Sequence, residues 1–355
     1  MSAATTKVRP EAEPRLIRVG PIRLRFSWRA TLLTGLLVLV AIGLVFAALG
    51  TGPLPASPSE VIDTILRRTD EFDFVVLDIG LPRGLVALLV GAGLGAAGAL
   101  VQALTRNPLG SPDVIGFDSG ATLGALVALL VFDLNDRQLA APFALAGGIA
   151  AALVVFALSS GGRDVGYRIV LIGIGIGAML DAGSAYLLTR AKVTEAMSSA
   201  RWLVGSLNNS DWTDVRIALI GLVLLLPAAL VLARRLRLVL LGNEVASTLG
   251  LNLKVTTFGT LVVAVGLSAI AVLAAGPISF VALVAPQLAG RLVGLQRAPS
   301  VLAAAAMGAV LLTGADLIGS RAFGDADLPV GVVTGLVGGV YLAVVLARLW
   351  RRRVA

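Results

Sequence analysis

Most ionisable residues of this chain lie outside its apolar stretches, and two exceptions are the first candidates for chemistry. Asp181 lies midway along the apolar stretch 169–188, and Asp316 lies near one end of the stretch 301–318. A carboxylate in an apolar environment is costly, so it lines a water-filled pathway or pairs with a cation. For Asp181, pathway lining and a structural pair with an arginine both stay open. A proton relay needs a chain of Asp, Glu or His residues, and the sequence shows none.

The chain contains no histidine and no cysteine. It therefore has no imidazole base, no thiolate nucleophile and no disulfide framework. A bare metal ion would depend on carboxylates, which the apolar stretches almost lack. We expect no catalytic residue, no metal ligand and no cofactor bound by this chain.

Two nucleotide-binding motifs can be tested directly. Residues Gly93 to Gly98 match G-x-G-x-x-G, but the dinucleotide fingerprint needs a preceding strand and a βαβ unit. These glycines lie within an apolar stretch, which favours helix packing. No G-x-x-x-x-G-K-[ST] motif occurs, and none of Lys7, Lys192 and Lys254 follows a glycine. ATP-driven work by this chain would therefore require a separate ATPase.

The composition places most of the chain in lipid. It is 57% hydrophobic and 14% charged, against about 45–50% and about 25% in soluble domains. The net charge of +8 could suggest nucleic acid, but that partner needs a contiguous basic face. Here the charges lie between apolar stretches, as membrane topology signals do, so we expect lipid and no nucleic acid.

About ten stretches are apolar enough to cross a bilayer, which takes roughly 20 helical residues each. They are 30–50, 81–104, 115–132, 139–158, 169–188, 215–233, 255–275, 280–295, 301–318 and 330–349. The fold class is thus an all-α polytopic membrane protein, with a basic tail at 1–29 and a transmembrane domain at 30–355. An even number of spans places both termini on one side.

The distribution of arginine orients these spans. Arginines cluster before the first span and after the last, and in the loops that lie on the same side. The positive-inside rule makes that side cytoplasmic, and we expect the tail to be flexible. The opposite loop at 51–80 is acidic.

Small residues recur every fourth position in three stretches. Gly91, Gly95 and Ala99 form one stripe, Gly173 and Gly177 a second, and residues 331, 335 and 339, all glycine, a third. Lipid gives helices no hydrophobic reason to pair, so small residues that allow close backbone approach hold them together. The stripes predict close helix packing, within the chain or between subunits.

Several motifs carry a more specific signal. Leu81-Pro82-Arg83 opens the second span, Gln102 follows near its end, and residues 106–116 read RNPLGSPDVIG. These segments resemble the FecCD-type permeases, the family of vitamin B12 and iron–siderophore importers. Asn107 and Pro108 belong to this motif, and Pro108 and Pro112 break the helix at a membrane edge.

A second motif lies between the sixth and seventh spans, at about 241–254. Gly242, Asn243, Glu244, Ala246, Leu249 and Gly250 match the family pattern L-G-x-x-x-A-x-x-L-G. The resemblance implies that they form the coupling element which docks on the ATPase. From the residues alone, Ala246 and Leu249 share one face of a short helix bracketed by two glycines. On that basis a plain surface loop stays open.

Two further segments extend the resemblance over nearly the whole chain. Residues 275–286 end at Pro286, and Gln287 stands where the family usually has histidine. Residues 328–334 include Pro329 and Gly331 of the family's L-P-V-G pattern. Gly80 replaces a common arginine that faces the substrate-binding protein in the B12 importer, and Arg321 is an alternative docking residue. Three details, among them residues 107–117, favour the ferric-enterobactin branch.

The resemblance implies a permease subunit of an ABC importer in the bacterial cytoplasmic membrane. Its partners would be a second permease, identical or homologous, two ATPase subunits that hold ATP, and an extracytoplasmic binding lipoprotein. The pathway would run between the permeases and be lined partly by the fifth and tenth spans. The cargo would be ferric iron held by a siderophore, with vitamin B12 or haem as alternatives. A secondary transporter is a further alternative, but it predicts an inverted repeat, and none is evident.

Overall fold

The architecture comes from a computed structural model of the whole chain. It describes residues 15–19, 22–26, 28–51, 57–68, 72–134, 137–159, 165–293, 300–322 and 328–354. All structural statements below concern these residues.

Every predicted span contains a helix, which confirms the helical fold class. The helices are α1 (Trp28–Gly50), α3 (Leu81–Thr105), α4 (Phe117–Leu126), α5 (Arg137–Ser159), α6 (Val165–Arg190), α8 (Trp212–Val239), α10 (Leu253–Ala275), α11 (Val281–Val293), α12 (Val301–Arg321) and α13 (Val330–Val354). Seven helical segments have the length and hydropathy to cross a membrane, and Phe117–Val131, Val281–Val293 and Val330–Val344 are shorter apolar helices. The number of ten spans therefore stays a prediction.

Six short elements lie between these helices and were not predicted, apart from the α9 region. They are α2 (Pro58–Ile65), η1 (Phe74–Gly80), η2 (Asp113–Ile115), η3 (Val127–Val131), α7 (Val193–Leu203) and α9 (Asn243–Thr248). Helix α2 begins at a capping box, in which Ser57 Oγ accepts from the Glu60 amide and Glu60 accepts from the Ser57 amide. Such boxes satisfy amides that a helix start leaves without partners.

Part of the basic tail forms a β-hairpin, which the sequence analysis did not predict. Strands β1 (Arg15–Val19) and β2 (Ile22–Phe26) pair antiparallel, with Arg15 opposite Phe26. Their sequences alternate apolar and basic residues in part, and Gly20-Pro21 lies between them, a pattern typical of a hairpin. Residues 1–14 of the predicted tail lie outside the described residues.

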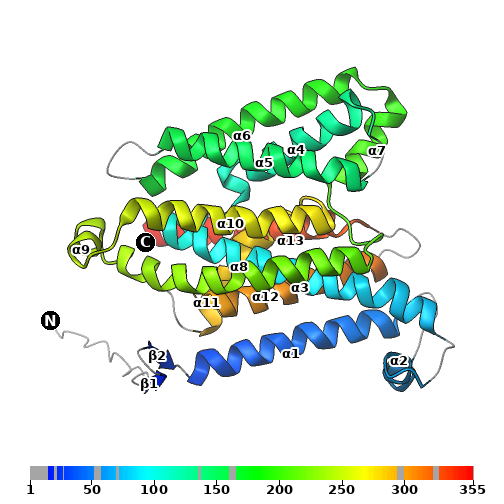
Figure 1. Ribbon diagram of the computed structural model, residues 1–355, viewed down its shortest axis with the longest axis horizontal. Helices are drawn as coiled ribbons and strands as arrows, with labels where there is room; N and C mark the ends of the chain where they lie inside the picture. The colour runs from blue at the N-terminus through cyan, green and yellow to red at the C-terminus, as the bar shows by residue number, and fades with distance from the viewer. Residues whose placement is uncertain are drawn as a thin grey trace.

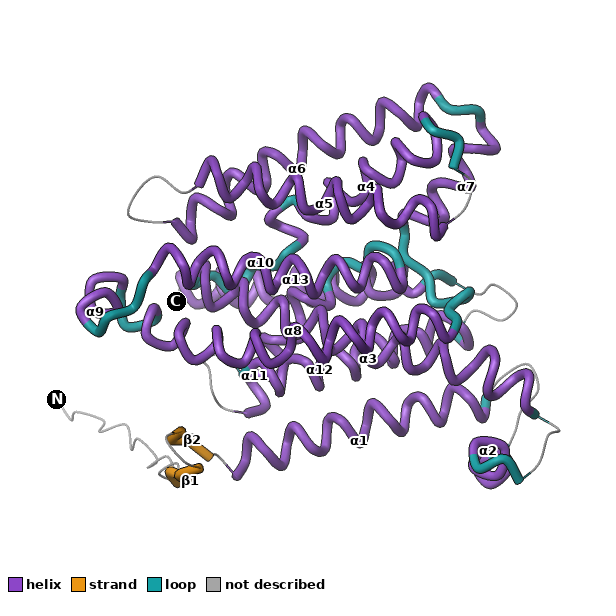
Figure 2. The backbone as a smooth tube through the Cα atoms, in the orientation of Figure 1, coloured by secondary structure: helices purple, strands orange, loops and turns teal. Residues whose placement is uncertain are grey.

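Helix α3 occupies the centre of the molecule. It packs against α8, α10, α11 and α12, while α4, α5 and α6 form a group on one side and α1 lies on the other (Figures 1 and 2). The start of α1, the end of α13 and α9 all lie toward the same end (Figure 1). This end is called the α9 end below.

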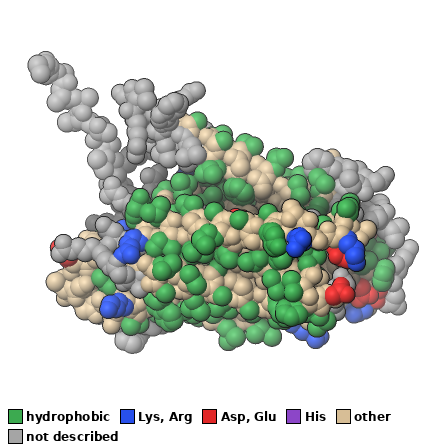
Figure 3. Space-filling view, turned by 90° about the horizontal axis from the view of Figure 1, so that it is seen from above, with side chains coloured by type: hydrophobic (Ala, Val, Ile, Leu, Met, Phe, Trp, Pro, Cys, Tyr) green, Lys and Arg blue, Asp and Glu red, His purple; other side chains and the backbone are tan. Residues whose placement is uncertain are grey.

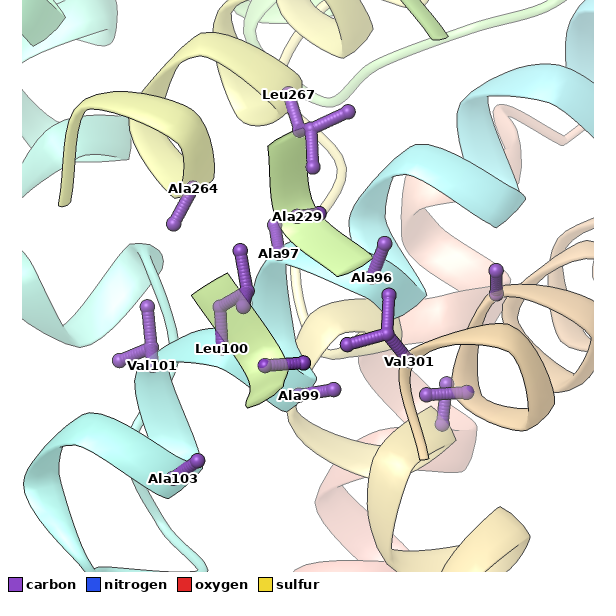
Figure 4. Packing of buried hydrophobic residues seen from close by; sticks show 14 of the residues in the cluster. Ala96, Ala97, Ala99, Leu100, Val101, Ala103, Ala229, Ala264, Leu267 and Val301 are labelled. Carbon is purple, nitrogen blue, oxygen red and sulfur yellow. The ribbon is translucent and has the colours of Figure 1, made fainter. Parts of the chain in front are cut away.

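The core around α3 consists mainly of alanine, valine and leucine. Figure 4 shows Ala96, Ala97 and Leu100 of α3 among residues of α8, α10 and α12. A methyl group added at Gly91 or Gly95 would overlap the backbone of α12. The first glycine stripe thus serves close packing, as predicted.

The stripe in α13 behaves differently. Gly331 lies against the Val204 carbonyl, but a Cβ at Gly335 or Gly339 would meet no atom within 4 Å. These two positions make no close packing within the chain, and a contact between subunits stays the prediction for them. They leave a shallow, outward-facing strip on α13.

The outer surface is largely hydrophobic, and large apolar side chains of α1, α6, α8 and α13 are exposed. On the face that Figure 3 shows, hydrophobic side chains cover the middle of the molecule, while acidic side chains gather toward one end. An apolar belt between polar ends suits a protein that spans a bilayer.

Candidate functional site

Helix α9 is a short helix of six residues, and a glycine lies close to each of its ends. Gly242 has φ 112° and Gly250 has φ 82°, backbone conformations that side chains with a Cβ adopt only with strain. The glycine breakers predicted from the sequence are thus present, and they set α9 off between α8 and α10. The element protrudes at its end of the molecule (Figure 1).

The two residues that the sequence places on one face of α9 differ in exposure. Ala246 is fully buried, whereas Leu249 is 59% exposed. Ala246 anchors the helix, because its small side chain lets α9 pack closely on the protein. The exposed side chains in and beside α9 include Leu241, Glu244, Val245 and Leu249, and these four are called the α9 knob.

Arg106 connects α9 to the end of α3, a contact that the sequence analysis did not identify. Its Nη2 donates to the Val239 carbonyl at 2.6 Å and to Asn243 Oδ1 at 2.5 Å. Asn243 is therefore held by Arg106 and is only partly exposed. The signal for Arg106 was its place at the start of the RNPLGSP motif.

The predicted motif residues Gln102, Asn107 and Pro108 come together beside Arg106. Gln102 Nε2 donates to the Leu283 carbonyl of α11 at 2.9 Å, and Asn107 Oδ1 accepts from the Leu109 amide at 2.9 Å. Pro108 offers its carbonyl to Gln287 Nε2 at 2.7 Å. These residues thus bind the α3–α4 loop to α11.

Arg83 was predicted as a pathway or motif residue, and the structure places it in a pair. Its Nε donates to both carboxylate oxygens of Asp316 at 3.1 Å, and its Nη2 reaches Asp316 Oδ1 at 2.9 Å. The two side chains are only 18% and 6% exposed. The pair joins α3 to α12, so Asp316 is neutralised within the chain.

Asp181 lies on the exposed surface of α6. The described residues show no ion pair for it, whereas Ile174 and Met179 beside it are 58% and 71% exposed. A carboxylate midway along an apolar helix is costly against lipid. This position therefore favours a polar surrounding, such as a pathway, over a structural pair in the same subunit.

Two carboxylates that the sequence analysis passed over lie deep in the protein. Asp113 Oδ2 accepts from the Phe280 amide at 3.3 Å, and Phe280 has φ 69°. Asp113 Oδ1 and Asp118 Oδ2 are buried without a hydrogen-bond partner in the described part of the chain. Gly116 between them lies beside Gly173 and Gly177, midway along α6. Asp113 was missed because it precedes the predicted span.

The remaining predicted residues are dispersed. Pro286 lies inside α11, and Gly331 donates its amide to the Gly205 carbonyl at 3.3 Å, next to Pro329. Arg321 ends α12 at the end opposite α9, where its Nη2 meets the Ala48 carbonyl at 3.4 Å. Arg321 is thus exposed on the surface where a binding protein was expected.

Comparisons with known proteins identify the family. The model of the FecCD transport family matches residues 36–348. The ferric enterobactin transport system permease protein FepG of Escherichia coli is 44% identical over 79% of this chain and 84% of its own length. The Fe(3+)-citrate import system permease protein YfmE of Bacillus subtilis is 32% identical over 88% of this chain and 93% of its own.

A solved structure shares the fold. It is described as an inward-facing conformation of a putative metal-chelate type ABC transporter, with a TM-score of 0.77 and 26% identity. The similarity covers 90% of this chain and 99% of the other. The resemblance inferred from the motifs is confirmed.

Proposed function

The chain belongs to the FecCD transport family and is a multi-pass permease subunit of an ABC transporter, and from this premise we propose that it carries ferric siderophores inward across the bacterial cytoplasmic membrane. The observation that carries the cargo assignment is the 44% identity to a ferric enterobactin permease. The composition supports it, because a chain without His or Cys suits a cargo that keeps iron within its own chelator.

We place the α9 end in the cytoplasm. The arginine-rich loops belong to this end, and the α9 knob offers Leu241, Val245 and Leu249 as an exposed apolar cluster beside Glu244. Such a protruding cluster fits a groove on a partner. The partner in this proposal is the ATPase, present in two copies, which holds the ATP.

The pathway in this proposal lies between two permease subunits, along the outward faces of α6 and α13. Asp181 on α6 needs a polar surrounding, and the strip at Gly335 and Gly339 lets a large cargo or a second subunit approach α13. An extracytoplasmic lipoprotein delivers the cargo at the opposite end, near Arg321. Nucleotide-driven rocking of the two permeases then alternates access.

Reconstitution tests the assignment. The permease, its partner permease, the ATPase and the binding protein are placed in proteoliposomes, and uptake of iron-loaded catecholates and hydroxamates is compared with that of haem and vitamin B12. We expect ATP-dependent uptake of at least one siderophore and none of the other cargoes. If only haem or vitamin B12 were taken up, that compound would replace ferric siderophores as the assigned cargo. Uptake without any bound ATPase would favour a secondary transporter.

A further inference from the structure

Arg106 holds the α3–α4 loop against the end of α8 and the start of α9. It ends α3 in the left-handed conformation, with φ 51°, which turns its side chain away from the helix. One guanidinium nitrogen, Nη2, meets the last carbonyl of α8, at Val239, and the first side chain of α9, at Asn243. If α9 moves relative to α3, either these hydrogen bonds break or Arg106 moves together with α9.

The loop that follows Arg106 is stiffened by its own hydrogen bonds. The Asn107 amide donates to the Gln102 carbonyl at 3.2 Å, and the Gly110 amide donates to the Asn107 carbonyl at 3.0 Å. With the Asn107 side chain bound to the Leu109 amide, residues 106–110 form a compact turn. A compact turn transmits a displacement instead of absorbing it.

The far side of this turn is bound to α11 and α13. Gln287 Nε2 donates to the Pro108 carbonyl at 2.7 Å, and Gln287 Oε1 accepts from the Tyr341 hydroxyl at 3.3 Å. The Arg291 guanidinium lies 5.6 Å from the centre of the Tyr341 ring, within cation–π range. A continuous series of polar contacts thus runs from Asn243 of α9 to Tyr341 of α13.

We propose that Arg106 is a positioning residue that transfers the movement of α9 to α11 and α13, and so couples ATP hydrolysis to opening of the pathway. This inference rests on the proposed function, because it needs α9 to be moved by the ATPase. It adds a role for the arginine of the RNPLGSP motif and for Gln287, which stands at the usual histidine position. Arg106 itself touches neither cargo nor nucleotide in this role.

The chemistry of the contact explains why arginine is used. A guanidinium is planar and always charged, and it presents several donors at fixed angles. It can therefore hold the Val239 carbonyl and the Asn243 amide oxygen together. A lysine ammonium is a single, strongly hydrated point charge on a flexible stem, and it would hold the two acceptors in less fixed geometry.

The test measures cargo transported per ATP hydrolysed in the reconstituted complex. We expect Arg106→Ala to lower this ratio by about tenfold while ATPase co-purification and basal hydrolysis stay within about twofold. The ratio of Arg106→Lys should lie between those of the wild type and Arg106→Ala. Asn243→Asp keeps the acceptor oxygen and should retain the wild-type ratio. Asn243→Ala combined with Arg106→Ala should lower the ratio no further than Arg106→Ala alone, since residues in one contact are not additive.

Arg235→Ala is the matched control, because it removes an exposed arginine of α8 with the same change in charge and should keep the ratio. An unchanged ratio in Arg106→Ala overturns the inference, and so does a loss of uptake that only follows the amount of assembled complex. Loss of bound ATPase in Arg106→Ala but not in Asn243→Ala also overturns it, because Arg106 would then be a docking residue. A wild-type complex without ATP-driven uptake would instead refute the proposed function.

Discussion

Helix α3 has an arginine contact at each end, and the two contacts differ in kind. Arg83 near its start forms a charged pair with Asp316, in which both side chains are mostly buried. Arg106 after its end is exposed and binds a carbonyl and an amide oxygen, both neutral. A buried charge that loses its partner is costly, whereas an exposed donor can exchange its acceptors for water. The first end is therefore fixed, and the end near α9 can move.

The largest expected effect comes from breaking the fixed end. Asp316→Ala removes the carboxylate that pairs with the mostly buried Arg83, and breaking a buried ion pair by removing one partner should cost about 3–5 kcal/mol of stability. Thermal unfolding of the purified protein in detergent measures this loss. The double variant Arg83→Leu/Asp316→Leu removes both charges and should recover most of it. An Asp316→Ala protein as stable as wild type would show that the pair does not fix this end.

Disrupting the α9 knob should abolish transport without destabilising the fold. Glu244→Arg with Leu249→Asp alters two exposed side chains of α9, and mismatched charges at an interface cost several kcal/mol. We expect ATPase co-purification and uptake to be lost while binding-protein docking and the melting temperature stay unchanged. The control Glu195→Arg with Met197→Asp makes the same changes in charge on α7, away from α9, where it also removes the surface ion pair of Glu195 with Lys192, and it should retain the ATPase. Normal ATP-driven uptake in the α9 variant would contradict the docking assignment.

A smaller effect is expected along the packed part of α3. Gly91→Ala introduces a methyl group against the α12 backbone, and such overpacking costs about 1–3 kcal/mol. Gly339→Ala on the open face of α13 is the control and should leave the melting temperature within error. Equal melting temperatures for both variants would show that α3 and α12 separate easily. The contrast between a fixed and a mobile end of α3 would then be weaker.

The smallest effect concerns α2, at the end of the molecule opposite α9. Backbone and side-chain hydrogen bonds from Ser57 lower the pKa of Glu60 below its usual value. A lowered carboxylate pKa adds stability above the unfolded value, and this stability is lost as the pH falls through the folded value. The protection factors of the α2 amides, which correct the exchange rate for its intrinsic pH dependence, should therefore fall on acidification below the usual pKa of glutamate. Glu60→Gln should show no such dependence, and an identical dependence in both proteins would exclude the capping box.

The sequence was sufficient to predict where the helices lie along the chain, but it predicted few of the contacts between them. Apolar length located all ten predicted helical segments, and Gly242 and Gly250 marked the limits of α9. Apolar length carries no information about partners, so the pairing of Arg83 with Asp316, 233 positions apart, could not be read from it. Ala246 and Leu249 show the same limit, because a three-residue spacing does not reveal that one of the two side chains is buried and the other exposed.

The junction before α4 has a consequence for the electrostatics of the protein interior. Helix α4 starts at Gly116, which has φ 84° and offers no side chain to cap the helix, and this start lies beside the midpoint of α6. The free amides and the dipole of a helix start create a partial positive charge, here far from water. Asp118 in the first turn and Asp113 just before it place acidic groups at that spot. A helix start favours acidic groups near it, so the position of α4 lowers the cost of keeping these two side chains in an apolar interior.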